Sequence, residues 1–131
     1  MKKEKKTILV LEDEPLLIDS ISFKLNKEGY NFVVKKVADE ALAYVLENPP
    51  PDFFWIDHYL IGKENGLFFL SRIKQNPKFA HIPTFVVSNT ASPDTIEKYK
   101  KIGITRYYTK ANHRLDEIVA DIGTLLQHNQ K

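Results

Sequence analysis

Hydrophobic and polar positions follow two different periods along this chain. Short apolar runs of strand length alternate five times with longer segments in which apolar residues recur every three or four positions. The runs cover residues 7–11, 32–34, 52–57, 84–88 and 105–109. Continuous apolar runs are typical of strands that are buried on both faces of a sheet.

The longer segments carry the start and stop signals of helices. Pro15 lies in the first turn of the first segment, and the prolines at 49–51 end the second. Ser92, Pro93 and Asp94 offer the fourth helix a capping hydroxyl, a proline at its first position and an acid in its first turn. The clearest apolar stripe is that of the last helix, which comprises Leu115, Ile118, Val119, Ile122, Leu125 and Leu126.

Five repeats of strand then helix predict an α/β fold with a doubly wound parallel sheet, because parallel strands need crossover connections that cover both faces. A length of 131 residues corresponds to one domain. We expect residues 7–127 to form it, with a basic flexible tail at 1–6 and a C-terminal tail at 128–131. In such folds ligands bind beyond the carboxyl ends of the strands.

Composition excludes several classes of function. The sequence has no cysteine, which excludes disulfides and thiolate metal sites and fits a reducing compartment. No apolar run is long enough for a membrane span or a signal peptide. The net charge of +2 arises in residues 1–6, which carry +3, so the rest of the chain carries −1. We therefore expect a cytoplasmic protein without membrane contact or direct DNA binding.

Polar residues follow four of the five predicted strands. Glu12 and Asp13 follow the first, Asp57 ends the third, Ser88 ends the fourth and Lys110 follows the fifth. These side chains should converge, because all carboxyl ends of a parallel sheet lie at one edge. Clustered carboxylates repel one another unless a cation joins them, and oxygen ligands suit Mg²⁺.

Around such an ion, Asp57 is a carboxylate nucleophile that could form an acyl phosphate. Lys110 could neutralise charge on phosphoryl oxygens and Ser88 could donate a hydrogen bond to one of them. Each residue alone has an ordinary explanation as a helix cap, turn residue or surface residue. The combination at successive strand ends is what indicates phosphoryl chemistry.

Together these residues resemble the CheY-like receiver domains of bacterial two-component response regulators, over about Lys6 to Leu126. Asp57 lies 44 residues beyond Asp13, Ser88 lies 31 beyond Asp57 and Lys110 lies 22 beyond Ser88. The resemblance implies a flavodoxin-like sheet with strand order 2-1-3-4-5 and five helices. It also implies these roles: Asp57 as phosphoacceptor; Glu12, Asp13, Asp57 and the backbone carbonyl of Tyr59 as metal ligands; Ser88 and Lys110 as phosphoryl-stabilising groups; and Tyr107 as switch residue.

The function implied is that of a stand-alone receiver in two-component or phosphorelay signalling, not a turnover enzyme. A sensor histidine kinase or histidine phosphotransfer protein would phosphorylate Asp57 with Mg²⁺. The signal would reach a downstream protein through the surface of the fourth helix, fifth strand and fifth helix. One alternative is a degenerate receiver that binds partners without phosphorylation. Another is an aspartyl-phosphate hydrolase, although its usual second aspartate is replaced here by Tyr59.

Four positions depart from the family pattern. Ile61 replaces a proline, Gly66 comes one residue late, and Asn89 replaces a small residue beside the phosphoryl site. Ala111 replaces the proline that follows the family lysine in a cis peptide bond. A cis bond without proline costs about 3–4 kcal/mol, which predicts a trans bond between Lys110 and Ala111, or a strained cis bond held by its surroundings.

Aromatic residues near the strand ends also have structural interpretations. Trp55 is expected in the core, and His58 is interpreted as a lateral loop residue beside Asp57. Tyr107 is interpreted either as the switch or as a core aromatic residue.

Overall fold

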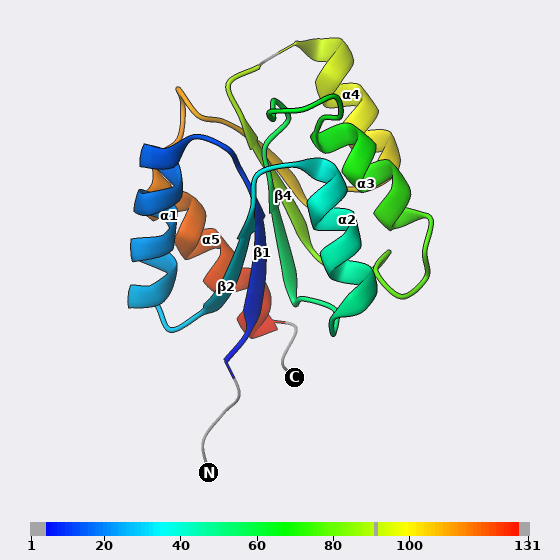
Figure 1. The fold of residues 1–131 in the computed structure, drawn as a ribbon. Coiled ribbons are helices and arrows are strands. Elements are labelled where there is room, and N and C mark those ends of the chain that lie inside the picture. The colour runs from blue at the N-terminus through cyan, green and yellow to red at the C-terminus, as the bar shows by residue number, and fades with distance from the viewer. Residues whose placement is uncertain (1–4, 91, 129–131) are drawn as a thin grey trace.

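The computed structural model describes residues 5–90 and 92–128, within which strands and helices alternate (Figure 1). The strands are β1 (Thr7–Leu11), β2 (Asn31–Lys35), β3 (Phe53–Ile56), β4 (Thr84–Ser88) and β5 (Arg106–Thr109). The helices are α1 (Pro15–Lys27), α2 (Ala38–Glu47), α3 (Gly66–Lys74), α4 (Pro93–Ile102) and α5 (Leu115–His128). All ten predicted elements are present, with ends that differ by a residue or two.

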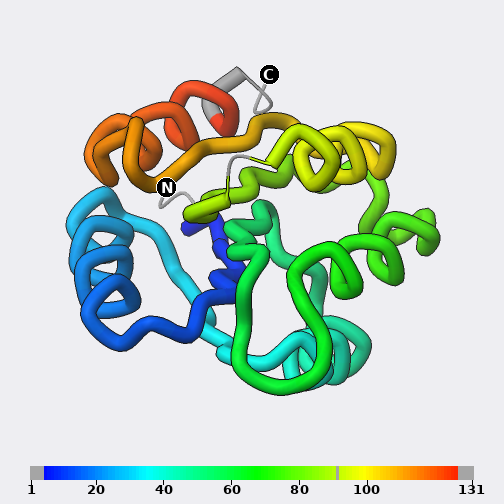
Figure 2. The backbone as a smooth tube through the Cα atoms, turned by 90° about the horizontal axis from the view of Figure 1, so that it is seen from above, coloured from blue at the N-terminus to red at the C-terminus, as the bar shows by residue number. Residues whose placement is uncertain are grey.

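The strands form one parallel sheet in the order β2-β1-β3-β4-β5, as predicted. Helices α1 and α5 cover one face, and α2, α3 and α4 cover the other (Figures 1 and 2). This doubly wound arrangement follows from the right-handed crossovers that parallel strands require.

The core consists of two apolar layers, one on each side of the sheet. Successive side chains of a strand point to opposite faces. Leu9 and Phe54 therefore pack under α2, α3 and α4, whereas Val10 and Trp55 pack under α1 and α5. Every residue of β3 is buried, which explains why its sequence is a continuous apolar run.

The two ends of α4 can be compared with the capping residues that the sequence offers there. Helix α4 begins at Pro93 as predicted, but the Ser92 hydroxyl makes no capping hydrogen bond. The expected cap is therefore wrong; the N–H of Ser92 instead donates to the Thr90 hydroxyl, at 3.2 Å. Helix α4 ends at Ile102 and is capped by Gly103, whose φ of +100° is a left-handed conformation that glycine adopts without strain.

The predicted tails lie largely outside the described residues. Lys5 and Lys6 are described and extend from the start of β1, whereas residues 1–4 are not described. His128 belongs to α5, so the helix continues one residue beyond the predicted domain end. In the described part of the chain, no helix combines the length and the apolar character that crossing a membrane requires.

Candidate functional site

The polar residues that follow the strands gather at one edge of the sheet, where the carboxyl ends of the strands lie (upper edge in Figure 1). Glu12, Asp13 and Asp57 come from β1 and β3, and each contributes one carboxylate oxygen to a group within 4.8 Å of one another. Ser88 is the last residue of β4 and Lys110 follows β5 directly. The structure thus brings together the carboxylates that the sequence predicts to converge.

The three carboxylates differ in burial and in hydrogen bonding. Glu12 is fully buried, Asp57 is 4% exposed and Asp13 is half-buried. The Asp57 N–H donates to the Leu11 carbonyl at 2.9 Å, which fixes the third strand end against the first. One oxygen of Glu12, Oε2, accepts hydrogen bonds from the N–H groups of Asp13 and Glu14, at 3.1 and 3.2 Å.

The other oxygen of Glu12, Oε1, is buried and lies 3.1 Å from the Lys110 ammonium, whereas Asp57 Oδ1 is buried without a partner among the described residues. An ionised oxygen without a partner in the interior is costly, by about 1–3 kcal/mol or more. A hard divalent cation with oxygen ligands would satisfy Asp57 Oδ1 and add positive charge beside Glu12 Oε1. The donor set therefore fits Mg²⁺.

Electrostatics at the site depend on the ammonium of Lys110. Its Nζ lies 3.1 Å from Glu12 Oε1 and 3.2 Å from Asp57 Oδ2. Burial, and then the charge of Asp57, raise the pKa of Glu12 to about 7 although Lys110 acts in the opposite direction. Burial lowers the pKa of Lys110, but the charges of Asp57 and Glu12 outweigh it and the net shift is upward. Lys110 therefore carries its positive charge into the cluster.

The predicted trans bond between Lys110 and Ala111 is confirmed, since the described residues contain no cis peptide bond. Lys110 reaches the carboxylates with this geometry. Its backbone N–H donates to the Ser88 carbonyl at 2.8 Å, which joins the ends of β4 and β5.

The residues after β4 connect the site to β5. Ser88 is fully buried and its Oγ accepts a long hydrogen bond of 3.4 Å from the Thr90 N–H. Asn89 is exposed. Tyr107 is half-buried, and its hydroxyl donates to the Thr90 carbonyl at 2.8 Å. Burial raises the pKa of Tyr107, so this hydroxyl keeps its proton at neutral pH.

The loop from β3 to α3 (green in Figure 2) extends outward from the sheet and returns to the strand end at Gly66. A Cβ at this position would lie 2.3 Å from the Asp57 carbonyl oxygen, so only glycine fits. The Gly66 N–H donates to the His58 carbonyl at 3.0 Å, and the Asn65 side chain caps α3. Ile61, which replaces the family proline, lies in the outer part of this loop and is 54% exposed.

His58 lies in the loop after β3, as predicted, but the interpretation of it as a lateral residue is wrong because it is buried. It is 8% exposed, and its Nδ1 is hydrogen-bonded to the hydroxyl of Tyr99 in α4, at 2.7 Å. Burial lowers the pKa of His58, although the charge of Asp57 acts in the opposite direction. Burial also raises the pKa of the fully buried Tyr99. Tyr99 is not among the predicted site residues, because in the sequence it looks like one apolar position of a polar helix.

Tyr59 lies on the outer side of His58. Its side chain is 58% exposed, and its ring packs edge-on against the imidazole with 4.8 Å between centroids. Its backbone carbonyl as a metal ligand stays a prediction.

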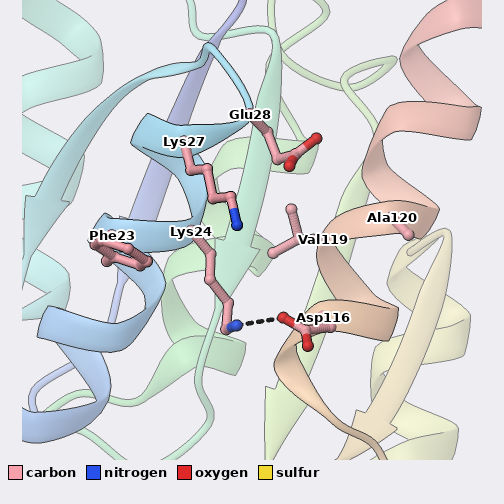
Figure 3. A pocket seen from close by; sticks show the side chains of 7 residues that line it. All are labelled: Phe23, Lys24, Lys27, Glu28, Asp116, Val119 and Ala120. Atoms are coloured by element: carbon pink, nitrogen blue, oxygen red, sulfur yellow. Dashed lines mark hydrogen bonds and ion pairs between the residues drawn. The ribbon is translucent and has the colours of Figure 1, made fainter.

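A surface groove of about 230 Å³ lies away from the carboxylates, between α1 and α5 (Figure 3). Lys24 and Asp116 form an ion pair across it. The groove is lined by Phe23, Lys24, Lys27, Glu28, Asp116, Val119 and Ala120. None of the strand-end residues contributes to the groove, so it is separate from the candidate chemistry.

Comparison with known proteins gives a consistent result. The response regulator receiver domain family matches residues 8–122. The DNA-binding dual master transcriptional regulator RpaA of Synechocystis is 26% identical over 127 residues, which are 95% of this chain and 50% of that protein. The phosphate regulon regulatory protein PhoB of Pseudomonas aeruginosa is 26% identical over 105 residues, or 80% of this chain and 45% of that protein. The chain thus spans about half the length of these curated relatives.

Among solved structures, the phosphorylated cyanobacterial phytochrome response regulator RcpA is similar, with a TM-score of 0.78 and 25% identity, covering 93% of this chain and 91% of that one.

Proposed function

The chain belongs to the response regulator receiver domain family of two-component signalling, and from this premise we propose that it is a switch phosphorylated on Asp57. The observation that carries the proposal is the cluster of three carboxylates, in which Asp57 Oδ1 is buried without a partner among the described residues and the Lys110 ammonium contacts Oε1 of Glu12 and Oδ2 of Asp57. Support also comes from RcpA, which was solved in a phosphorylated form.

In the proposed reaction a carboxylate oxygen of Asp57 forms a bond to the phosphorus of the donor. The bond from phosphorus to the donor atom breaks, and its electron pair leaves with the donor, which takes up a proton. Bound Mg²⁺, held by Glu12, Asp13 and Asp57, would supply positive charge against the carboxylates and the phosphoryl oxygens. Lys110 would contact a phosphoryl oxygen and Ser88 would donate a hydrogen bond, while Tyr59 would add a carbonyl to the metal site.

The upstream donor is proposed to be a histidine kinase or histidine phosphotransfer protein. Its phosphohistidine has to reach Asp57, so the donor must cover the strand-end edge, where α1 begins. Helix α1 exposes Leu16 and Phe23, by 77% and 69%, seven residues apart and therefore on one side of the helix. Exposed apolar groups of this kind often mark protein contact surfaces. We assign this side of α1 to the donor.

The output is proposed to reach a downstream protein through α4, β5 and α5. Tyr107 contributes to this surface from β5, and its hydroxyl donates a hydrogen bond to the Thr90 carbonyl. A movement of the chain at Ser88 would therefore displace the Tyr107 ring. Phosphorylation shifts the equilibrium between the inactive and the active conformation only to the extent that the phosphoryl group makes more favourable contacts in the active one. The proposed role is that of a signalling switch and not that of an enzyme that turns over a substrate. Stand-alone operation and a cytoplasmic location stay predictions.

The test is incubation with Mg²⁺ and phosphoramidate, followed by intact mass. We expect a gain of one phosphoryl group in the wild type and in Asp52→Asn, a control at the opposite end of β3. Asp57→Asn should show no gain, and neither should the wild type with excess chelator. If the wild type gains nothing under forcing conditions, the chain is a degenerate receiver and the proposal fails.

A further inference from the structure

Helix α4 is attached to the protein mainly through one side chain. Tyr99 is the only fully buried residue of this helix, which the structure describes in full. Its neighbours Lys98, Lys100 and Lys101 are all exposed. A helix with so little buried apolar surface depends on its few anchoring contacts for its position.

The polar end of this anchor lies beside the phosphoacceptor strand. The Tyr99 hydroxyl is hydrogen-bonded to Nδ1 of His58, at 2.7 Å, and the residue before His58 is Asp57. The same hydroxyl lies 2.9 Å from the position that a Cβ of Gly66 would occupy. The end of β3, the start of α3 and the middle of α4 therefore meet at a single buried hydroxyl group.

The ring of Tyr99 also contacts the proposed output side. Its centroid lies 5.9 Å from that of Tyr107 in β5, and 5.5 Å from that of His58. Tyr107 in turn holds the loop after β4 through the Thr90 carbonyl. Tyr99 thus stands between the backbone of the phosphoacceptor and the residues expected to respond to it.

We propose that Tyr99 is a positioning residue whose hydrogen bond to His58 links the position of α4 to ion binding at Asp57. The inference rests on the proposed function, because it concerns the same site. Linkage is reciprocal: if fixing α4 favours the geometry that binds Mg²⁺, binding Mg²⁺ must favour the fixed α4.

Removing the hydroxyl tests the link while preserving the ring. In Tyr99→Phe, Nδ1 of His58 stays buried without its partner, so the backbone on both sides of His58 loses a restraint. A less preorganised site binds its ion more weakly. The matched control is Tyr108→Phe, which deletes the hydrogen bond from another buried tyrosine hydroxyl, to Asp121 Oδ2 at 2.6 Å, between β5 and α5.

Two measurements separate positioning from simple packing. The Kd for Mg²⁺ can be followed by fluorescence of Trp55, the single tryptophan, which is buried in β3. We expect Tyr99→Phe to raise this Kd about threefold or more. In the absence of Mg²⁺, amide hydrogen exchange in residues 93–102 should be about tenfold faster in Tyr99→Phe than in the wild type. Adding Mg²⁺ should slow this exchange less in the variant than in the wild type. Tyr108→Phe should leave both quantities within about twofold of the wild type.

His58→Phe removes the same hydrogen bond from its other end and should raise the Kd in the same way, so it replaces Tyr99→Phe if that variant does not fold. If both variants fold, a double-mutant cycle completes the test. Each single change removes the same hydrogen bond, so the double variant should raise the Kd no more than either single variant. Additive effects, or a Tyr99→Phe Kd equal to that of the wild type, would overturn the link. Absence of Mg²⁺ binding by the wild type would instead overturn the proposed function, and the link with it.

Discussion

We expect Mg²⁺ binding to release a proton from Glu12, and the affinity of the site to rise with pH as a result. Glu12 is fully buried, and its pKa is raised from 4.5 to about 7, first by burial and then by the charge of Asp57. Metal ligands bind in their deprotonated form. Lys110 keeps its proton when the ion binds, because the charges of Asp57 and Glu12 raise its pKa and an ammonium is not a metal ligand.

The size of the pH effect on Mg²⁺ affinity follows from the raised pKa of Glu12. If only deprotonated Glu12 binds the ion, the apparent Kd should fall about tenfold between pH 6 and pH 8 and level off above that range. The same shift makes the metal-free protein less stable as pH rises from 4.5 to about 7. Across this window the native state binds more protons than the unfolded state, and the loss is about 3 kcal/mol at most. Saturating Mg²⁺ should remove that loss.

The assay is isothermal titration of Mg²⁺ at pH 7 in two buffers that differ in ionisation enthalpy. The difference between the observed enthalpies gives the protons released, which should be about half a proton for each ion. Glu12→Gln should abolish the release and bind Mg²⁺ more weakly at high pH. Glu14→Gln, an exposed neighbour two residues on, should behave like the wild type.

Two results would refute this reasoning. One is an affinity that does not change between pH 6 and pH 8, because Glu12 would then be ionised throughout. The other is a proton release that persists in Glu12→Gln, because the proton would then come from another group.

Three further variants test the surroundings of the site. Gly66→Ala should lower the free energy of unfolding by about 2 kcal/mol or more in urea, because its Cβ would collide with the Asp57 carbonyl, whereas Gly123→Ala in α5 should be neutral or stabilising; equal effects would contradict the close approach. Lys110→Met should destabilise the metal-free protein by about 2 kcal/mol at pH 8, with recovery on adding Mg²⁺, as seen by thermal melting; no loss would mean that the ammonium does not balance the carboxylates. Asn65→Ala should cost about 1 kcal/mol in the same urea experiment, since the cap of α3 is lost, and an unchanged midpoint would argue against that cap.

The pattern of apolar and polar positions along the chain was enough to predict the fold and the convergence of the carboxylates. Continuous apolar runs require strands buried on both faces, and such strands require helices between them. Once the sheet is parallel, residues that directly follow its strands must share one edge, whatever the details of packing. Glu12, Asp13 and Asp57 could therefore be placed together without knowledge of any tertiary contact.

Local sequence patterns predicted the role of a single residue less reliably where that residue could make other contacts. Ser92 has the residue type and position of a helix cap, yet its hydroxyl makes no capping bond. Gly66 looked like a shifted family position, whereas the structure shows that it allows α3 to approach the Asp57 backbone. In both cases the local pattern identified the element correctly and the packing decided what each residue does in it.

The burial of His58 and its hydrogen bond to Tyr99 depend on how distant parts of the chain pack together. These residues are 41 positions apart, and their contact depends on the rotation of α4 about its axis and on the path of the loop after β3. Hydrophobic periodicity constrains neither quantity, because a tyrosine in a polar helix and a histidine after a strand are both common on surfaces. The sharing of Lys110 between Glu12 and Asp57 was undetermined for the same reason, since a long side chain can reach several partners and only the positions of all three groups select among them.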